Sequence, residues 1–407
     1  MTTQELYTLA EQFGTPLYLF DARELRMRVD TLKRALGPRA KLCFAVKANP
    51  FIIPMVAPLV ERLEVCSPGE YRICEACDMD ASELVISGVH KDADLIRELA
   101  AAPQLPGRFT IESLTQLELL NAVGAELDRR LPVLIRVSSG NQFGIDVEAV
   151  ESVIAHRRHY RYLDMCGLQL FSGTQKTSAR RVVRELERLD ALAQHLAHGH
   201  GWQARELEYG PGLPVAYFAD DAFDEAGLLA ALRDTLDHLQ HEGPVVLELG
   251  RSIAASCGTY LTRVVDTKCN RGEHYAVVDG GIHHLVYFGQ SMAMHQPPCH
   301  LLPAALAHGN TGAIAQAPAS AANKHWNICG SLCSVNDILV KQLPASHLSP
   351  GDLLAFERAG AYCMTEGISL FLSRDLPCVV TIDEQGNAEL SRASMPTYPF
   401  NAPRVTG

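Results

Sequence analysis

The sequence predicts an α/β protein, a (β/α)8 barrel followed by a smaller, mostly β domain. Apolar strand-like runs alternate with amphipathic helical segments up to about residue 255, and eight such runs occur. After residue 260 the helical periodicity weakens, and short β-like runs separated by turns replace it. Because the spacing of the eight runs is uneven, a doubly wound sheet remains the alternative.

Two domains are also what the length predicts, since 407 residues are too many for one hydrophobic core. We place the barrel at residues 25–262 and the β domain at residues 263–407. The N-terminal segment, residues 1–24, is expected to join the β domain. No internal repeat is visible beyond the alternation of strands and helices.

Taken in order, the chain begins with a helix, a short strand and a second helix, predicted at 1–14, 15–20 and 21–36. Barrel strands are expected at 42–46, 63–66, 84–87, 108–111, 133–137, 165–170, 207–209 and 245–249. Strands of the β domain are expected at 259–267, 274–278, 327–329, 352–356 and 378–382. The segment 293–322, rich in Ala, Pro, His and Gly, predicts a long loop or lid.

Charge and hydropathy exclude several classes of partner. The formal net charge is −11 and no basic stripe occurs, which argues against binding to nucleic acid or an anionic membrane. No apolar run is long enough to span a membrane, and the polar start of the chain lacks the features of a signal peptide. We therefore expect a cytoplasmic protein whose twelve cysteines are reduced thiols.

Lys47 closes the first barrel strand, which is mostly apolar. Burial penalises an ammonium group and favours the neutral, nucleophilic amine that a Schiff-base lysine needs. On local sequence alone, the favoured interpretation is that Lys47 marks the point where a strand meets water. The residues at the ends of the other strands help to distinguish these two interpretations, because the active site of such a barrel lies at the carboxyl ends of its strands.

Polar residues and glycine turns follow several of these strand ends. They include Arg136, Gly210, Gly212, Glu248 and Arg251. A lysine, glycine turns before helices and an acid-Gly-Arg corner suit a ligand that carries a phosphate and reacts with an amine.

Four short motifs lie on these elements and in the β domain. They are FAVKAN at 44–49, ELGR at 248–251, GSLCSVND at 330–337 and GAY at 360–362. In this order the motifs resemble those of the fold-type III pyridoxal-phosphate decarboxylases, the family of diaminopimelate, ornithine and arginine decarboxylases. The resemblance covers nearly the whole chain. It implies a lyase with pyridoxal 5′-phosphate as its cofactor and a barrel of the alanine-racemase type.

The resemblance also implies roles for individual residues. Lys47 would hold the cofactor as an imine, and Glu248 would face the pyridine nitrogen and keep it protonated. The protonated ring is then the electron sink for the loss of CO₂. The other cofactor-binding residues would be Phe171 at the ring and Thr174, Gly210, Gly212, Arg251 and Tyr362 at the phosphate. A surface ion pair for Arg251, and core positions for Phe171 and Tyr362, are the structural alternatives.

A homodimer with shared active sites follows from the same resemblance. Cys333 would reach the site of the partner subunit, where it would help to place the substrate and protonate the product carbon. An inert buried thiol is the alternative for this residue. Residues expected near the substrate are Arg136, His283, His284, Ser334 and Asp337.

Three departures from the family pattern concern the barrel. Pro211 interrupts a glycine triplet and removes one backbone N–H donor from the phosphate-binding turn. The segment between Arg136 and Gln142 is shorter than usual, which trims a loop near the mouth of the site. Gln169 replaces a histidine that is common on the sixth strand.

A fourth departure concerns the substrate. Diaminopimelate decarboxylases place an arginine after an Asp-x-Gly turn to grip the distal carboxylate, and an acid directly after the cysteine. Here no arginine lies between Arg271 and Arg358, and Ser334 follows the cysteine, so a bidentate carboxylate clamp is missing. We therefore expect an amino acid bound to a carrier protein or conjugated to another acid, as in branches of the family in antibiotic and siderophore biosynthesis, rather than free diaminopimelate.

Two other functions fit the same fold, an amino-acid racemase or epimerase and a non-catalytic protein that binds the cofactor. Alanine racemases put an arginine at the pyridine nitrogen, where this chain has Glu248. Non-catalytic relatives consist of the barrel alone, whereas this chain has a second domain. No metal is expected, because Cys74 and Cys77 lie on a predicted helix without a second pair and the histidines at 195, 198 and 200 suit a helix end.

Overall fold

The computed structural model describes residues 1–288, 295–304 and 324–403, and the chain divides into two compact units. The barrel unit consists of Arg26–Val215 and Phe223–Ile253. The second unit consists of Met1–Leu25, Ala216–Ala222 and Ala254–Gly407. Within the described ranges, no helix is long and apolar enough to cross a membrane.

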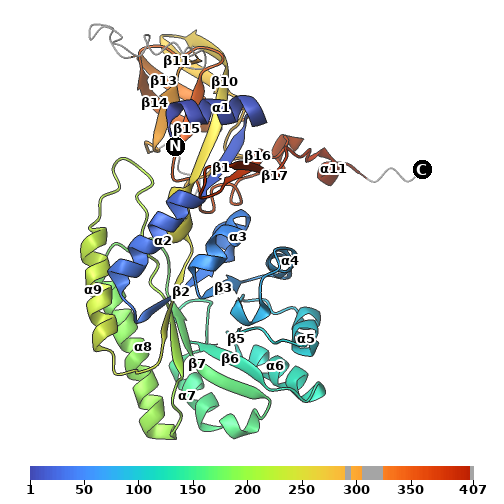
Figure 1. Ribbon diagram of the computed structural model, residues 1–407, viewed down its shortest axis with the longest axis vertical. Coiled ribbons are helices and arrows are strands. Elements are labelled where there is room, and N and C mark those ends of the chain that lie inside the picture. The colour runs from blue at the N-terminus through green and yellow to red at the C-terminus, as the bar shows by residue number, and fades with distance from the viewer. Residues whose placement is uncertain (289–294, 305–323, 404–407) are drawn as a thin grey trace. The chain divides into compact units, whose positions relative to one another are not determined.

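A closed barrel of eight parallel strands forms the core of the barrel unit (Figure 1). The strands are β2 (Ala40–Ala45), β3 (Arg62–Val65), β4 (Leu84–Ile86), β5 (Arg108–Ile111), β6 (Leu131–Arg136), β7 (Leu163–Phe171), β8 (Glu206–Gly210) and β9 (Val245–Leu249). Each strand pairs with the next, and β9 pairs with β2 to close the ring. The predicted (β/α)8 barrel is therefore confirmed, and the doubly wound sheet is wrong.

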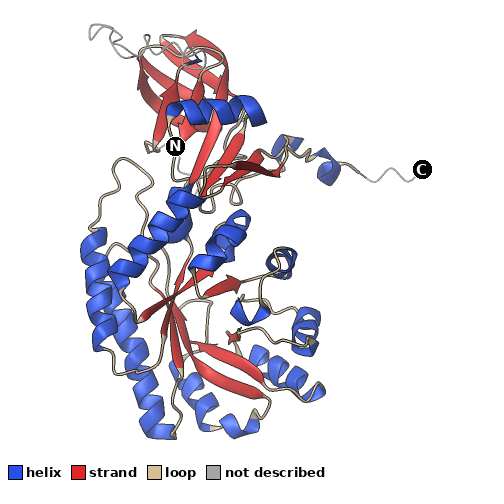
Figure 2. Cartoon of the chain, viewed as in Figure 1, coloured by secondary structure: helices blue, strands red, loops and turns tan. Residues whose placement is uncertain are grey.

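Helices surround these strands (Figure 2). They are α2 (Ala22–Leu36), α3 (Ile53–Val56), α4 (Pro68–Ala76), α5 (Ala93–Ala101), α6 (Leu114–Glu126), α7 (Val147–Ala155), α8 (Ala179–His200), α9 (Glu225–His238) and α10 (Arg251–Ala254). Three of them begin at a serine, Ser67, Ser113 or Ser178, whose hydroxyl accepts a hydrogen bond from a backbone N–H of the first turn. Such caps satisfy donors that the helix itself cannot, so they fix where each helix starts.

An ionic layer crosses the barrel interior near the N-terminal ends of the strands. Glu206 of β8 accepts hydrogen bonds from Arg62 of β3 at 3.0 and 2.9 Å and from Arg108 of β5 at 2.6 and 2.9 Å. These strands are not neighbours in the ring, so the contacts pass through the interior. Because a buried charge is tolerated when it is paired, this layer is part of the core.

The second unit is built on a mostly antiparallel sheet. Its strands are β1 (Leu17–Asp21), β10 (Gly258–Asn270), β11 (Glu273–Val278), β12 (Cys299–Leu302), β13 (Lys324–Cys329), β14 (Ile338–Ala345), β15 (Leu353–Phe356), β16 (Cys378–Ile382) and β17 (Ala388–Arg392). The order is β14-β13-β11-β10-β1-β16-β17, with β15 paired to β10 and β12. The helices α1 (Thr3–Phe13) and α11 (Tyr398–Asn401) belong to the same unit.

The N-terminal strand β1 lies in the middle of this sheet. All five of its residues are buried, and it pairs with β10 on one side and β16 on the other. Trp326 of β13 is buried in the same unit, and its indole N–H donates to the carbonyl of Ala345 at 3.2 Å. The first and last parts of the chain thus fold together as one unit.

Three strands, β12, β14 and β17, were not predicted from the sequence. β12 falls inside 293–322, so the prediction of a continuous loop there is wrong for residues 299–302, while 305–323 lie outside the described residues. Lys47 also differs slightly from expectation. The strand β2 ends at Ala45, and Lys47 lies in a single 3-10 turn, Val46–Ala48.

Candidate active site

Lys47 is positioned by the turn that follows β2. After Val46–Ala48 the chain turns again at Asn49, whose side chain accepts a hydrogen bond from the backbone N–H of Phe51 at 3.0 Å, with Pro50 beginning the next turn. The Lys47 side chain is 39% exposed, so its amine is accessible at the carboxyl end of the barrel. This is the end at which barrel enzymes bind their ligands.

Two carboxylates from the strands on either side of β2 flank this amine. The Lys47 Nζ atom lies 2.8 Å from Oε2 of Glu64 on β3 and 3.5 Å from Oε1 of Glu248 on β9. The strand register explains the arrangement, because Glu64 is paired with Ala45, and Glu248 with Cys43. Both carboxylates are buried.

The two carboxylates differ in charge. Burial alone would raise the pKa of Glu64, but the Lys47 ammonium and further hydrogen bonds lower it to about 2. Burial, together with the charge of Glu64, raises the pKa of Glu248 well above its usual range. Glu64 is therefore the ion partner of Lys47, whereas burial and the charge of Glu64 favour the protonated form of Glu248.

A third buried acid, Glu208 of β8, extends this polar layer. Its Oε1 accepts a hydrogen bond from the Gln169 side chain of β7 at 2.5 Å. Burial and the nearby charge of Glu64 raise the pKa of Glu208 to about 7. Gln169, which replaces the histidine common on the sixth strand, is thus the hydrogen-bond partner of Glu208, a carboxyl group that titrates near neutrality.

The turn that follows β8 carries the two predicted phosphate-binding glycines. Gly212 has a φ of +60°, and a Cβ atom there would lie 2.1 Å from the carbonyl oxygen of Gly173 and 3.1 Å from the Cα of Thr174. A Cβ on Gly210 would lie 2.3 Å from the ring of Phe171. Only glycine fits these two positions, and the close packing brings the predicted residues Phe171 and Thr174 to this turn.

Lys176 forms hydrogen bonds with the carbonyl groups of this turn. Its backbone N–H donates to the Gly212 carbonyl at 2.9 Å, and its buried ammonium lies 3.4 Å from the Gly210 carbonyl and 2.6 Å from Glu185. Both carbonyls of the glycine turn are therefore directed toward Lys176. Pro211 supplies no N–H group to an anion bound at this turn.

Arg136 ends β6 and forms a stacked arrangement with two aromatic rings. Its guanidinium donates to Glu112 at 2.8 Å and lies 4.8 Å from the ring centre of Phe143 and 6.0 Å from that of Phe171. Arg251 begins α10 directly after β9 and is buried. All the predicted residues of the barrel unit thus lie on strands or turns at its carboxyl end.

The remaining predicted residues belong to the second unit. Asp337 is buried, and its two carboxylate oxygens accept the backbone N–H groups of Ile282 and Leu332 at 2.8 and 2.7 Å. It therefore braces two turns, and the predicted role at the substrate finds no support in its contacts. Cys333 and the half-buried Ser334 lie in the turn before it, where Cys333 is exposed.

His283 and His284 are buried with their rings 3.7 Å apart. The His284 ring is bonded to the Asp375 carbonyl at 2.8 Å and to the Tyr260 hydroxyl at 3.3 Å. Burial lowers the pKa of His283 to about 3 and that of His284 to about 4, so both are neutral near pH 7. Tyr362, half-buried, has a φ of +66°, and its carbonyl accepts two backbone N–H groups of the following turn.

Sequence reasoning assigned no role to several polar residues of the barrel site, although it placed Glu64 and Lys91 at strand ends. They are Glu64, Glu208, Lys176 and Lys91, and burial lowers the pKa of Lys91 to about 8. A charged residue inside an otherwise apolar strand was the available signal for Glu64 and Glu208. No group of three or more potential metal ligands gathers anywhere in the described ranges.

The residues at this end of the barrel fit pyridoxal phosphate. Lys47 offers an accessible amine for the aldehyde, and the protonated Glu248 beside it is a carboxyl group suited to a ring nitrogen. The turn from Gly210 to Gly212 leaves room that a Cβ would fill, which suits a phosphate. When bound, the cofactor supplies an electron sink for the charge left by CO₂.

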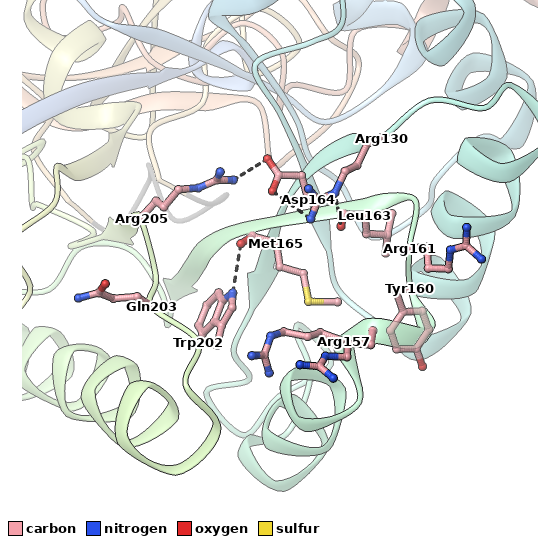
Figure 3. A pocket seen from close by; sticks show the side chains of 11 residues that line it. Arg130, Arg157, Tyr160, Arg161, Leu163, Asp164, Met165, Trp202, Gln203 and Arg205 are labelled. Atoms are coloured by element: carbon pink, nitrogen blue, oxygen red, sulfur yellow. Dashed lines mark hydrogen bonds and ion pairs between the residues drawn. The ribbon is translucent and has the colours of Figure 1, made fainter.

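A cavity of about 610 Å³ lies at the opposite end of the barrel, around the start of β7 (Figure 3). Five arginines line it, namely Arg130, Arg157, Arg158, Arg161 and Arg205. Arg205 pairs with Asp164 at 2.6 Å, and the indole N–H of the buried Trp202 donates to the Met165 carbonyl at 3.3 Å (Figure 3). None of the predicted site residues is among the described residues that line this cavity.

Comparison with protein families gives a match to the model described as "Pyridoxal-dependent decarboxylase, C-terminal sheet domain" over residues 17–360. A diaminopimelate decarboxylase of Pseudomonas aeruginosa is 31% identical over 405 residues, which cover 95% of this chain and 92% of that protein. The L-glutamyl-[BtrI acyl-carrier protein] decarboxylase of Niallia circulans is 24% identical, with coverage of 95% and 93%.

Solved structures show the same fold. The diaminopimelate decarboxylase of M. jannaschii in complex with L-lysine has a TM-score of 0.83 at 22% identity, covering 99% of this chain and 94% of that chain. A lysine/ornithine decarboxylase of Vibrio vulnificus complexed with putrescine has a TM-score of 0.79 at 21% identity, covering 95% and 98%. The barrel and the β unit are thus shared with known decarboxylases.

Proposed function

Since the chain belongs to the family of pyridoxal-dependent ornithine, diaminopimelate and arginine decarboxylases, we propose that it decarboxylates an amino acid whose far end is attached to a carrier protein or to another acid. It is a pyridoxal-phosphate-dependent carboxy-lyase that acts on an amino acid. The proposal concerns its substrate, the residues that act on it and the assembly that completes the site.

The observation that carries the substrate proposal is the missing cationic clamp. No arginine lies between Arg271 and Arg358, and the turn after Asp279 presents His283 and His284 in its place. Both imidazoles are neutral near pH 7, and the His284 ring is held by hydrogen bonds within its own unit. A neutral pair does not replace a bidentate guanidinium, so His283 and His284 themselves offer no cation to the distal carboxylate of free diaminopimelate.

One relative supports the same direction. The Niallia circulans protein acts on a glutamyl group carried by an acyl-carrier protein, and its similarity extends over 95% of this chain. The more similar Pseudomonas aeruginosa protein acts on diaminopimelate. Of these two precedents, the missing clamp supports the one with a substrate whose far end is not a free amino acid.

We assign the following work to residues of the barrel. Lys47 binds the cofactor, and Glu64 at 2.8 Å takes up the positive charge of its amine and orients it. Glu248 holds a proton at the ring nitrogen, which a carboxylate favours and which the arginine of a racemase would not. The glycine turn from Gly210 to Gly212, with Thr174 and Arg251, binds the phosphate, and Phe171 lies against the ring.

The proposal includes a homodimer in which Cys333 acts in the partner's site. The turn that holds Cys333 exposes it together with Val335, which is 90% exposed. A second exposed surface consists of Leu370, Phe371, Leu372, Tyr398 and Phe400, each between 44% and 68% exposed. Asn401 joins the two segments by donating to the Leu370 carbonyl at 2.8 Å, and an apolar surface of this kind supports a subunit interface.

The substrate proposal is tested by measuring CO₂ release from the holoenzyme with two sets of compounds. One set contains free diaminopimelate, ornithine, lysine, arginine and glutamate, and the other contains amides and thioesters of diaminopimelate and glutamate at the distal carboxyl group. We expect kcat/KM to be at least about 100-fold higher for one of the conjugated compounds, the size of one lost charge-assisted contact or more. Efficient turnover of free diaminopimelate would overturn the proposal.

Two control measurements separate this reaction from the alternatives. The visible absorption of the bound cofactor should disappear in the Lys47→Ala protein, which establishes where the cofactor is held. Exchange of the α-proton without CO₂ release would identify a racemase instead.

A further inference from the structure

A groove of about 720 Å³ lies at the carboxyl end of the barrel unit, between α8 and the segment that follows β6. The residues Ser138, Ser139 and Asn141 of that segment form one side. The other side is the first half of α8, which contributes Arg181, Arg184 and Arg188. The groove size is that of a small-molecule site.

The groove borders the candidate active site. Arg136 and Phe171 end β6 and β7 and belong to the candidate active site. The guanidinium carbon of Arg136 lies 6.0 Å from the ring centre of Phe171. The next residue of each strand end, Val137 and Ser172, lines the groove. Only the ends of two strands therefore separate the groove from the site.

The charge of the groove is positive on a chain whose net charge is −11. Glu185 is its one acidic lining residue, and it is already bound to Lys176 at 2.6 Å and Arg181 at 2.9 Å. Arg184 and Arg188 have no hydrogen bond or ion pair within the part of the chain that the structure describes. Two like charges four residues apart repel each other, so both residues would gain from an anion.

The rest of the lining is apolar. Val137, Val147, Leu170, Leu189 and Leu192 form this part, and Val147 is 43% exposed. The groove therefore offers guanidinium groups at α8, an apolar wall and a few hydroxyl and amide groups. This combination suits a ligand that has a phosphate at one end and a flexible chain of methylene and amide groups behind it.

We propose that this groove binds the phosphopantetheine arm of a carrier protein, with Arg184 and Arg188 holding its phosphate and the apolar wall receiving its chain. The arm would carry the amino acid over the rim formed by β6 and β7 toward Lys47. The inference rests on the proposed function, since it names how a carrier-bound substrate is held. The groove is a binding site alone, because it lies outside the residues assigned to the reaction.

The test compares two ligands that differ by one phosphate, phosphopantetheine and pantetheine, by calorimetry on the holoenzyme. We expect phosphopantetheine to bind about tenfold or more tightly, and the Arg184→Gln/Arg188→Gln variant to lose this difference. The matched control is Arg158→Gln/Arg161→Gln, which removes two arginines from the cavity at the opposite end of the barrel and should keep the difference. Equal binding of the two ligands by the unmodified enzyme would overturn the inference.

Kinetics separate failure of this inference from failure of the proposed function. With an amino acid loaded on a carrier protein, the Arg184→Gln/Arg188→Gln variant should raise KM about tenfold and leave kcat unchanged. Turnover of the loaded carrier with an unchanged KM in the variant would overturn the groove and retain the proposed function. Specific phosphopantetheine binding without turnover of any carrier-bound or otherwise conjugated acid would retain the groove as a binding site and overturn the function.

Discussion

The amine of Lys47 is shared unequally by Glu64 and Glu248, and this inequality divides the work between them. Glu64, with a pKa lowered to about 2, remains ionised under all ordinary conditions and holds the amine. Glu248 keeps its proton because burial and Glu64 raise its pKa. Without a ligand, burial favours the protonated form of Glu248. When a protonated ring nitrogen lies beside it, the same burial strengthens the attraction between the carboxylate and that positive charge.

Replacement of Glu248 by glutamine tests this division. The amide keeps the size of the side chain but cannot hold a proton at the ring nitrogen. We expect kcat to fall on the order of 100-fold or more, while cofactor content measured by absorbance changes little. A protein that lost the cofactor but kept its activity per bound cofactor would contradict the assigned role.

Glu208 makes stability depend on pH. Its pKa is raised from 4.5 to about 7 in the folded protein, so the folded state retains a proton that the unfolded state releases. Its contribution is present in full below pH 4.5 and is lost as the pH rises toward about 7. Glu208→Gln, which is neutral throughout, should show a smaller fall in the free energy of unfolding across this range.

Chemical denaturation of the cofactor-free protein at a series of pH values measures this effect. The variant and the unmodified protein should be closest at pH 4.5 and diverge in favour of the variant toward pH 7.5. Glu187→Gln, at an exposed position on α8, is the control and should leave the slope unaltered. An unchanged slope in Glu208→Gln would contradict the pKa assigned to this carboxyl group.

The ionic layer formed by Arg62, Arg108 and Glu206 shows how whole strands are held together. It joins β3, β5 and β8 across the barrel, and none of its members is exposed at the catalytic end. We expect Glu206→Gln to cost about 3–5 kcal/mol of unfolding free energy, because two half-buried arginines inside the barrel lose their buried counter-charge. Urea denaturation of the holoenzyme measures this loss.

An exposed ion pair provides the comparison for that prediction. Arg72 and Glu98 lie 2.6 Å apart, but both side chains are about half exposed. Water and salt screen such pairs, so Glu98→Gln should cost about 1 kcal/mol or less. Similar losses in the two variants would show that the barrel layer is not a buried ionic contact.

Strands were predicted correctly from the sequence where their burial produces a run of apolar residues. The eight barrel strands are buried on both sides and appear as apolar runs, so each was found. β17 is mostly exposed and β14 contains Pro344, so neither has such a run. The site was predicted in the same uneven way. Lys47 and Glu248 stand in motifs, whereas the role of Glu64 depends on the pairing of β2 with β3, which local sequence does not contain.

Across the whole molecule, the proposed dimer has the clearest functional consequence. If each site takes Lys47 from one subunit and Cys333 from the other, inactive chains can complement each other. Mixing Lys47→Ala with Cys333→Ala subunits should restore up to about a quarter of the activity, because half the random pairs are mixed and each has one intact site. Co-purification of two differently tagged chains establishes that subunits have exchanged.

A chain that carries both substitutions is the control for complementation. Mixed with Lys47→Ala, it provides no lysine to any site and should restore nothing. Confirmed exchange without recovery in the first mixture would contradict shared sites. Substituting Phe371 with glutamate in the exposed apolar surface should also shift the protein toward monomers and lower activity in parallel.

The two tryptophans of the chain lie in different units, Trp202 in the barrel unit and Trp326 in the second. Both rings are buried and both indole N–H groups are hydrogen-bonded to carbonyls. Intrinsic fluorescence therefore contains one signal from each unit. A Trp326→Phe protein reports the melting of the barrel alone, and a Trp202→Phe protein reports that of the β unit, so the order in which the units unfold can be recorded optically without attaching a dye.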